Sequence, residues 1–159
     1  EYRKELNQTH ERDFLTVGGM GHANQIALGI ALQTKDRQVY CIDGDGAVLM
    51  HLGSVGIIGD ISPVNFKHII INNGSHDSVG GQPTVGFDIN FKKIFEGLNY
   101  KNSYKISNSS EFQSIFNEFK NSDGPSVVEI LVNKGARKNL GRPTLSPKEN
   151  KLDFMNFLK

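Results

Sequence analysis

The sequence predicts an α/β fold, a parallel, doubly wound sheet with helices on both of its faces. Apolar runs typical of buried strands alternate along the chain with stretches whose apolar residues recur at helical spacing. This alternation is typical of a parallel sheet whose strands are joined by helices. A length of 159 residues allows one domain with a substantial core, so we expect residues 1–159 to form a single domain.

Composition excludes several classes of protein. With 37% hydrophobic and 22% charged residues, the chain is ordinary for a globular protein, and its net charge of +1 argues against a nucleic-acid or membrane surface. No apolar run approaches the roughly 18 residues that span a membrane, and the polar start shows no signal peptide, so we expect a cytoplasmic protein. The single cysteine, Cys41, excludes an internal disulfide, and its apolar surroundings predict a buried thiol.

The first part of the fold is predicted to be a strand, a tight turn and a helix. A short apolar run, Phe14 to Val17, ends in the glycine-rich turn Gly18-Gly19-Met20-Gly21. The stretch from His22 to Gln33 has apolar residues at helical spacing. Small residues dominate one face of this helix, which indicates close packing against a sheet or another helix.

The central unit is predicted to be strand, turn, helix, strand and turn. Val39–Ile42 leads into Gly44-Asp45-Gly46, Ala47–Ile58 has helical periodicity, and His68–Ile71 leads into Asn72-Asn73. Ligands of parallel α/β sheets bind outside the carboxyl ends of the strands. We therefore expect the two turns to lie on neighbouring strands at one edge of the sheet.

The rest of the chain contributes one long loop and further strands and helices, for a total of about five strands. The loop is longer than about 15 residues, and such loops in compact domains are usually functional. The expected segments are the loop Asn73–Asn90, a short helix Asn90–Leu98, a strand within Asn99–Ser107, a helix Ser109–Asn121 capped by Ser109 or Ser110, a strand Pro125–Val132 and a closing helix Lys148–Leu158.

The two central turns offer oxygen ligands for a metal ion. Asp45 supplies a carboxylate and Asn73 an amide oxygen, and these hard donors suit Mg²⁺ or Ca²⁺. Gly46 opens a helix, whose free N–H groups attract phosphate. The residues themselves therefore predict a metal-bridged diphosphate site.

The same turns resemble the diphosphate-binding motif of the thiamine diphosphate enzymes, in which Gly-Asp-Gly is followed by Asn-Asn. Asn73 lies 28 residues after Asp45, close to the spacing of that family. The resemblance implies thiamine diphosphate and Mg²⁺ as cofactors, with the metal bound by the side chains of Asp45 and Asn73 and the main-chain carbonyl of Ser75. The cofactor-binding residues that it implies are Gly18, Met20, Gly44, Asp45, Gly46, Ala47, Asn73, Ser75, His76 and Asp77.

The glycine-rich turn also resembles this family. Met20 lies 25 residues before Asp45, where the family places the bulky residue that props the cofactor into its bent shape. The resemblance implies that Gly18 offers its carbonyl to the 4′-amino group and that Met20 offers its backbone N–H to the aminopyrimidine ring. His22 and His76 are the histidines that we place near the reacting centre.

Within the family, residues 72–84, residues 16–23 and the tail 134–144 resemble the phosphonopyruvate decarboxylases, although Gly19 stands where we expect serine. This resemblance implies a lyase of phosphonate biosynthesis, which decarboxylates 3-phosphonopyruvate to phosphonoacetaldehyde and CO₂ without oxidation. The alternative is a sulfopyruvate decarboxylase-type subunit acting on another 2-oxo acid, because those enzymes have a similar Gly-Gly-Gln-Pro-Thr loop. A cation of the basic tail could meet such an anionic substrate.

One group that the family needs has no candidate here. Thiamine diphosphate enzymes place a glutamate on the pyrimidine ring from a different domain, and Glu1, Glu5 and Glu11 lie in no apolar strand–turn context. We therefore expect this chain to be half of an active site, inactive alone and completed by a pyrimidine-binding domain or subunit in a homo-oligomer. Whether that half is fused or separate, the proton donor and the oligomer size are left open.

A second class of function is a non-catalytic nucleotide-binding module on a similar sheet. The dinucleotide fingerprint would need a third glycine, but Leu49 occupies that position. The acidic residue expected about 20 residues later is poorly matched, since Asp60 ends a predicted helix rather than a strand. The sequence therefore favours the diphosphate site of an enzyme.

Overall fold

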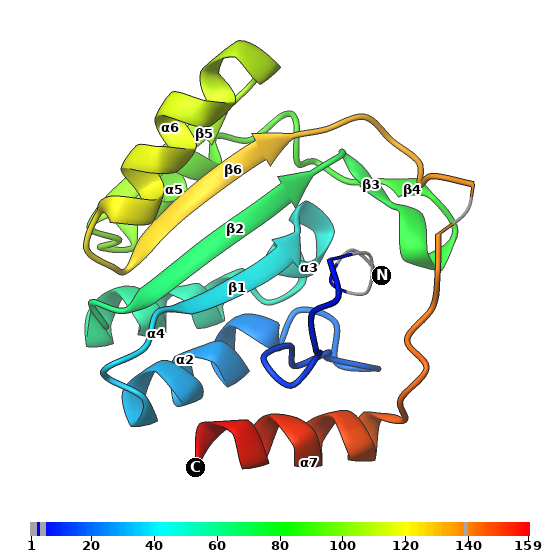
Figure 1. Cartoon of the computed structure of the whole chain (residues 1–159). Helices are drawn as coiled ribbons and strands as arrows, with labels where there is room; N and C mark the ends of the chain where they lie inside the picture. Colours follow the sequence, from blue (N-terminus) through cyan, green and yellow to red (C-terminus); the bar gives the residue numbers. More distant parts are fainter. Residues whose placement is uncertain (1–2, 4–5, 139) are drawn as a thin grey trace. The chain divides into compact units, whose positions relative to one another are not determined.

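A computed structural model describes residues 3, 6–138 and 140–159, so Glu1 and Glu5 lie outside the described residues. The chain divides into two compact units (Figure 1). One is formed by Met20–Lys134 and the other by Glu1–Gly19 together with Gly135–Lys159. Each unit is described by itself below.

The larger unit is built on a parallel sheet, as the sequence predicts, but the sheet has four strands rather than about five. Their order across the sheet is β1-β2-β6-β5, so the two strands of the central unit are hydrogen-bonded neighbours (Figure 1). The strands are β1 (Val39–Gly44), β2 (Phe66–Asn72), β5 (Asn102–Ile106) and β6 (Ser126–Leu131).

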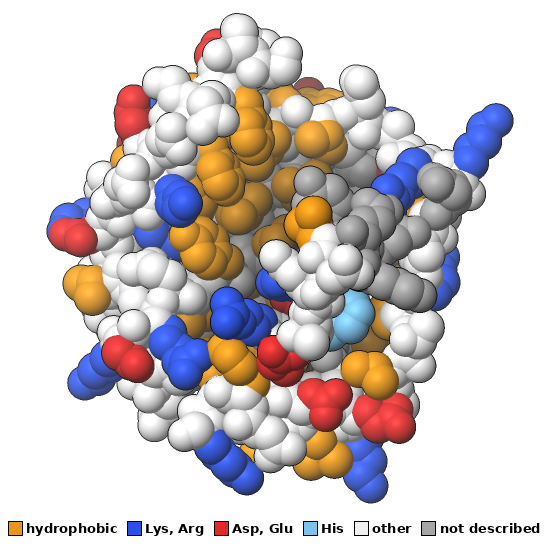
Figure 2. Space-filling model, in the orientation of Figure 1, with side chains coloured by type: hydrophobic (Ala, Val, Ile, Leu, Met, Phe, Trp, Pro, Cys, Tyr) orange, Lys and Arg blue, Asp and Glu red, His pale blue; other side chains and the backbone are white. Residues whose placement is uncertain are grey.

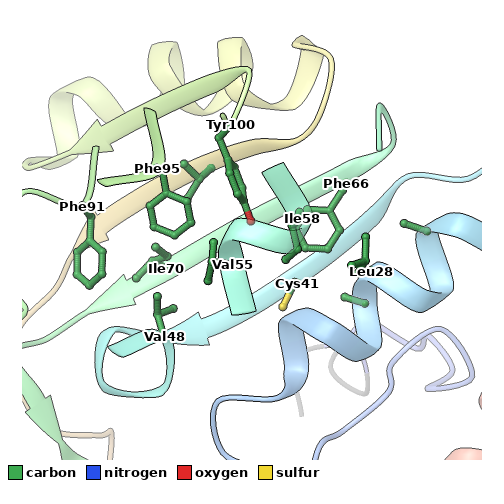
Figure 3. Packing of buried hydrophobic residues seen from close by; sticks show 13 residues of the cluster. Leu28, Cys41, Val48, Val55, Ile58, Phe66, Ile70, Phe91, Phe95 and Tyr100 are labelled. Carbon is green, nitrogen blue, oxygen red and sulfur yellow. The ribbon is translucent and has the colours of Figure 1, made fainter. Parts of the chain in front are cut away.

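Helices cover both faces of this sheet, which confirms the predicted fold class. One face carries α2 (Ala23–Gln33), α3 (Asp45–Met50), α4 (Leu52–Ile61) and α5 (Phe91–Gly97), and the other carries α6 (Ser109–Asn121) (Figure 1). Figure 3 shows the apolar cluster on the first face, in which side chains of all four of these helices meet the strands. The Phe95 ring contacts Tyr100 edge to face, with 4.7 Å between centroids.

The second face of the sheet is covered only in part. Phe119 of α6 packs on Ile69 and Val128 over β2 and β6. Lys67 is fully buried and donates a 2.7 Å hydrogen bond to the carbonyl of Phe119, near the carboxyl end of α6, where a cation is favourable. Over β1, by contrast, Tyr40 and Ile42 remain 42% and 65% exposed, and Figure 2 shows hydrophobic side chains gathered on this side of the molecule.

Two glycines of α4 allow a matched test of this packing. A Cβ added to Gly59 would lie 1.6 Å from the carbonyl oxygen of Leu98, whereas one added to Gly56 would lie 3.5 Å from a Leu98 methyl group, an ordinary contact. We expect Gly59→Ala to lower the free energy of unfolding by about 3 kcal/mol, because the backbone at Leu98 must shift. Gly56→Ala is expected to raise it by up to about 1 kcal/mol through helix propensity. Urea denaturation measures both, and equal effects of the two variants would contradict this packing.

Several predicted elements differ in detail. The helix predicted over Ala47–Ile58 is two helices, because the chain breaks at His51 between α3 and α4. The cap of α6 is Asn108, whose side chain accepts hydrogen bonds from two backbone N–H groups, rather than Ser109 or Ser110. The predicted loop after Asn73 contains β3 (Ser75–His76), paired antiparallel with β4 (Gln82–Pro83), and a 3₁₀ turn, η1 (Asp77–Val79).

The smaller unit is organised around α7 (Pro147–Leu158), close to the predicted closing helix. The run Phe14–Val17 is not a strand, because its residues contact α7 instead of pairing with another strand. Asn150 accepts a hydrogen bond from the Leu15 N–H at 2.9 Å and donates one to the Asp13 carbonyl at 2.7 Å, and the Phe14 and Phe154 rings contact each other. Within the described part of the chain, every helix is too short or too polar to cross a membrane.

Candidate active site

The two predicted turns meet at one edge of the larger sheet. Asp45 begins α3 directly after β1, and Asn73 follows directly after β2. Because Gly44 pairs with Ile71 in the parallel register of β1 and β2, both turns leave the sheet at its carboxyl edge. The structure thus brings together the two segments in which the sequence predicts metal and diphosphate binding.

Asp45 is a buried carboxylate, only 1% exposed, at this edge. The Thr84 hydroxyl donates a short hydrogen bond to its Oδ2 atom. Gly86 lies against the same carboxylate, since a Cβ added there would be 2.4 Å from Asp45 Oδ2 and 2.7 Å from Asn72 Oδ1. The long loop therefore closes onto the carboxylate and fixes its position.

The two adjacent asparagines have different roles in the structure. Asn72 is fully buried and donates 2.7 Å hydrogen bonds to the Gly86 carbonyl and to Glu129 Oε1, while its Oδ1 accepts from the Gly74 N–H at 3.1 Å. The Lys105 Nζ atom lies 3.2 Å from Glu129 Oε2, an ion-pair distance, but the two groups are not aligned for a hydrogen bond. Asn72 is therefore fully used in anchoring the loop, and the half-buried Asn73 is the amide that a ligand can reach.

Asn73 organises the start of the loop. Its Oδ1 accepts a 3.0 Å hydrogen bond from the Ser75 N–H, and its Nδ2 donates to Asp77 Oδ2 at 2.9 Å. The Ser75 hydroxyl is buried and has no partner among the described residues. Since an orphaned buried hydroxyl is costly, this atom marks a place where a bound polar ligand would be favourable.

The His76 imidazole packs against the turn that carries Asp45. A Cβ added to Gly46 would lie 2.4 Å from two atoms of this ring, so only glycine fits under it. The structure thus places His76 beside the predicted diphosphate-binding backbone of Gly46, and Asp77 is exposed next to it in the loop.

Next to the glycine-rich turn lies His51, a histidine that was not predicted from the sequence to be near the site. His22 is exposed and its ring lies 4.2 Å from the ring of His51, between centroids. Gly21 has a positive φ of 85°, and a Cβ there would lie 2.4 Å from His51 Nδ1, a buried atom without a partner in the described chain. His51 lies within a stretch of helical periodicity, so the sequence gives no sign that it lies at the glycine-rich turn rather than on the surface of a helix. Gly18 belongs to the smaller unit.

Behind the edge lies a buried polar cluster that the sequence analysis also missed. His68 Nε2 lies 3.0 Å from Asp43 Oδ2, which also accepts from Asn24 Nδ2 at 3.3 Å and Cys41 Sγ at 3.6 Å. Burial favours the protonated carboxyl, but the hydrogen bonds and the charge of His68 outweigh this and lower the pKa of Asp43. Cys41 is buried, as predicted, and burial raises the pKa of its thiol.

The contact between Gly86 and Asp45 leads to a specific expectation. Gly86→Ala would push the carboxylate from its position, so we expect the affinity for Mg²⁺ to fall by about tenfold or more, as for other residues that orient metal ligands. Gly97→Ala is the matched control, because a Cβ there meets nothing within 4 Å. Calorimetric titration with Mg²⁺ and the cofactor measures the difference, and an unchanged affinity in Gly86→Ala would show that the loop does not fix Asp45.

Known proteins resemble this chain over most of its length. It is 34% identical to a phosphonopyruvate decarboxylase of Streptomyces viridochromogenes over 98% of the chain and 39% of that protein. It is 37% identical to a sulfopyruvate decarboxylase subunit beta of Methanocaldococcus jannaschii over 78% of the chain and 64% of that protein. An Escherichia coli acetolactate synthase large subunit is 27% identical over 76% of the chain. The chain therefore spans about two fifths of the length of the phosphonopyruvate decarboxylases that it matches.

The family match covers nearly all of the larger unit, including the turns of the candidate site. Residues 2–130 match the family described as thiamine pyrophosphate enzyme, C-terminal TPP binding domain. This confirms the resemblance on which the predicted cofactor rests. The chain belongs to the C-terminal TPP-binding domain family of the thiamine pyrophosphate enzymes.

Proposed function

We propose that this chain is the diphosphate- and Mg²⁺-binding half of a thiamine diphosphate-dependent decarboxylase that acts on a small anionic 2-oxo acid. The observation that carries the proposal is the position of Asp45, a buried carboxylate at the carboxyl edge of the sheet, beside the strand that leads to Asn73. Family membership and the similarity to proteins named as decarboxylases support the same conclusion.

The metal ligands in this proposal are the Asp45 carboxylate, the Asn73 amide oxygen and the Ser75 main-chain carbonyl. All three are hard oxygen donors, which Mg²⁺ prefers together with phosphate oxygens and water. The residues fit this role, because Asn73 Oδ1 keeps a second lone pair beyond its bond from Ser75. The orphaned Ser75 hydroxyl is a further polar atom that a hydrated ion or a phosphate would satisfy.

The diphosphate would lie against the backbone of the same two turns. A Cβ added to Gly44 meets nothing within 4 Å, so the chain leaves open space beside this turn. Gly46 and Ala47 lie in the first turn of α3, where backbone N–H groups have no intrahelical partner and can donate to an anion. The N–H groups of His76 and Asp77 would complete the set from the loop.

When bound, thiamine diphosphate supplies the electron sink that decarboxylation of a 2-oxo acid needs. The residues of this chain would hold the cofactor and exclude water from it. Met20 would support its bent shape, and Gly18 and Met20 would offer a carbonyl and an N–H to its pyrimidine ring. His22 and His76 would lie near the reacting centre, where an imidazole can donate or accept a proton.

A second domain or subunit completes the site in this proposal. The family's glutamate on the pyrimidine ring has no candidate among the described residues, because Glu129, the buried glutamate of that set, is bound to Asn72. The chain matches only 39% of the length of the phosphonopyruvate decarboxylases, and other relatives are named as beta subunits. We therefore propose a pyrimidine-binding partner within a cytoplasmic homo-oligomer.

3-Phosphonopyruvate is the substrate that we favour. The similarity to phosphonopyruvate decarboxylases extends over 98% and 97% of the chain, so it includes the basic tail. Sulfopyruvate is the second candidate, because one sulfopyruvate decarboxylase beta subunit is 37% identical over 78% of the chain and another is 32% identical over 98% of it. Both substrates carry an anionic head that cations such as Lys134 or Arg142 could meet.

The experiment compares substrates on the complete enzyme, which is this chain together with its proposed partner domain or subunit. Aldehyde production from phosphonopyruvate, sulfopyruvate and pyruvate is measured at equal concentration with Mg²⁺ and thiamine diphosphate. We expect phosphonopyruvate to exceed the others by about a hundredfold, or roughly 2.7 kcal/mol in transition-state binding. A preference for sulfopyruvate would leave the cofactor assignment intact and replace the substrate, whereas no turnover of any 2-oxo acid would contradict the proposal.

A further inference from the structure

A single amide group connects the two turns of the candidate site. Asn24 is fully buried, and its Nδ2 lies 3.3 Å from Asp43 Oδ2 and 3.4 Å from the carbonyl oxygen of Gly21. Gly21 ends the glycine-rich turn, and Asp43 is the residue directly before Gly44-Asp45-Gly46. The amide nitrogen therefore bridges the turn expected to hold the aminopyrimidine and the turn expected to hold the diphosphate.

The orientation of the Asn24 amide is fixed by its surroundings. Its Oδ1 accepts from the Ser54 hydroxyl at 3.2 Å and from Gln25 Nε2 at 3.1 Å. On the other side, both neighbours of Nδ2 are acceptors, a carboxylate and a carbonyl. A flipped amide would set oxygen against oxygen, so the NH₂ group must face Asp43 and Gly21.

The Asp43 carboxylate is in turn fixed from the sheet. His68, fully buried on β2, lies 3.0 Å from the same Oδ2 atom, and its Nδ1 lies 3.4 Å from the Tyr100 hydroxyl. The rings of Phe66 and Phe95 each lie in an edge-to-face arrangement with the imidazole. Since bonds to a charged group in a buried site are strong and directional, the carboxylate is a rigid anchor for Asn24.

We infer that Asn24 is a positioning residue that sets the distance between the two cofactor-binding turns. This inference rests on the proposed function. Thiamine diphosphate spans both turns, so its affinity depends on their spacing, whereas inorganic diphosphate with Mg²⁺ needs only the turn at Asp45. The bridge is therefore specific for the whole cofactor and has no effect on its diphosphate end alone.

The test measures two affinities by calorimetry on the complete enzyme, one for thiamine diphosphate and one for inorganic diphosphate, both with Mg²⁺. In Asn24→Ala we expect the affinity for thiamine diphosphate to fall about tenfold, the effect of one hydrogen bond to a charged group, while that for diphosphate stays within about twofold. Asn24→Ser, which keeps a polar group too short to bridge both acceptors, is the second variant if alanine prevents folding.

Cys41→Ala is the matched control, because it removes another neighbour of the Asp43 carboxylate and leaves the bridge in place. We expect the ratio of the two affinities to be unchanged in this variant even if it lowers stability. Equal losses for both ligands in the Asn24 variants, or no loss for either, would overturn the inference. A wild-type enzyme that binds inorganic diphosphate but shows no affinity for thiamine diphosphate would instead reject the proposed function.

Discussion

Asp45→Ala is expected to abolish Mg²⁺-dependent binding of thiamine diphosphate and to lower the decarboxylation rate by about a thousandfold. The side chain is the one carboxylate of the proposed ligand set, and it is 1% exposed and held by Thr84, so no other residue of the set can replace its charge. Losing a preorganised charged group at a reaction centre costs about 10²–10³ in rate, and the weaker cofactor binding adds to this. Calorimetry with and without Mg²⁺ measures the binding, and a steady-state assay measures the rate.

Two further variants separate charge from structure. Asp45→Asn keeps the shape of the side chain and removes the charge, so it is expected to lose most of the metal affinity while keeping the fold. Asp60→Asn is the matched control, because Asp60 is exposed on α4 and its charge lies outside the proposed ligand set. If Asp45→Ala retained Mg²⁺-dependent cofactor binding, the metal would have to be held elsewhere.

Phe95→Ala is expected to have the largest effect on stability, about 3–5 kcal/mol in the free energy of unfolding, because it leaves a large cavity in the main core. The Phe95 ring is fully buried and contacts the rings of Phe91 and Tyr100 (Figure 3) and the imidazole of His68. Urea denaturation gives the change directly. Phe112→Ala is the control, since Phe112 is 41% exposed and should cost far less. A loss below about 1 kcal/mol for Phe95→Ala would contradict the described core.

The fold was largely predictable because the strands and helices of the larger unit follow simple periodicity. β2 is a nearly continuous run of buried residues, so its central part, His68–Ile71, was found. α6 repeats large apolar residues at helical spacing and was found with its observed bounds. The break at His51 was missed, because Val48, Leu49, Leu52 and Val55 keep helical spacing across it. The run Phe14–Val17 was wrongly expected to be a strand, because a strand of only four residues cannot be distinguished by sequence from a loop that packs on a distant helix.

The parts of the candidate site that belong to a local sequence motif were predictable. The contacts that segments distant in the sequence make with this motif were not. Asp45 and Asn73 follow strands, so their place at the carboxyl edge of the sheet could be derived from parallel topology. Gly86 lies 41 residues after Asp45, and no local pattern indicates that it contacts the carboxylate. The partners of Asp43 come from α2 and β2, and a hydrogen bond between distant segments leaves no periodic signal in the sequence.

The central claim is that Asp45 and its neighbours hold thiamine diphosphate through Mg²⁺. The most direct measurement is a calorimetric titration of the complete enzyme with thiamine diphosphate, in the presence of Mg²⁺ and again with the metal removed by a chelator. We predict saturable binding at one site per chain that requires the metal and is lost in Asp45→Ala. Binding of equal strength without the metal, or a preference for NAD or ATP over thiamine diphosphate, would contradict this account.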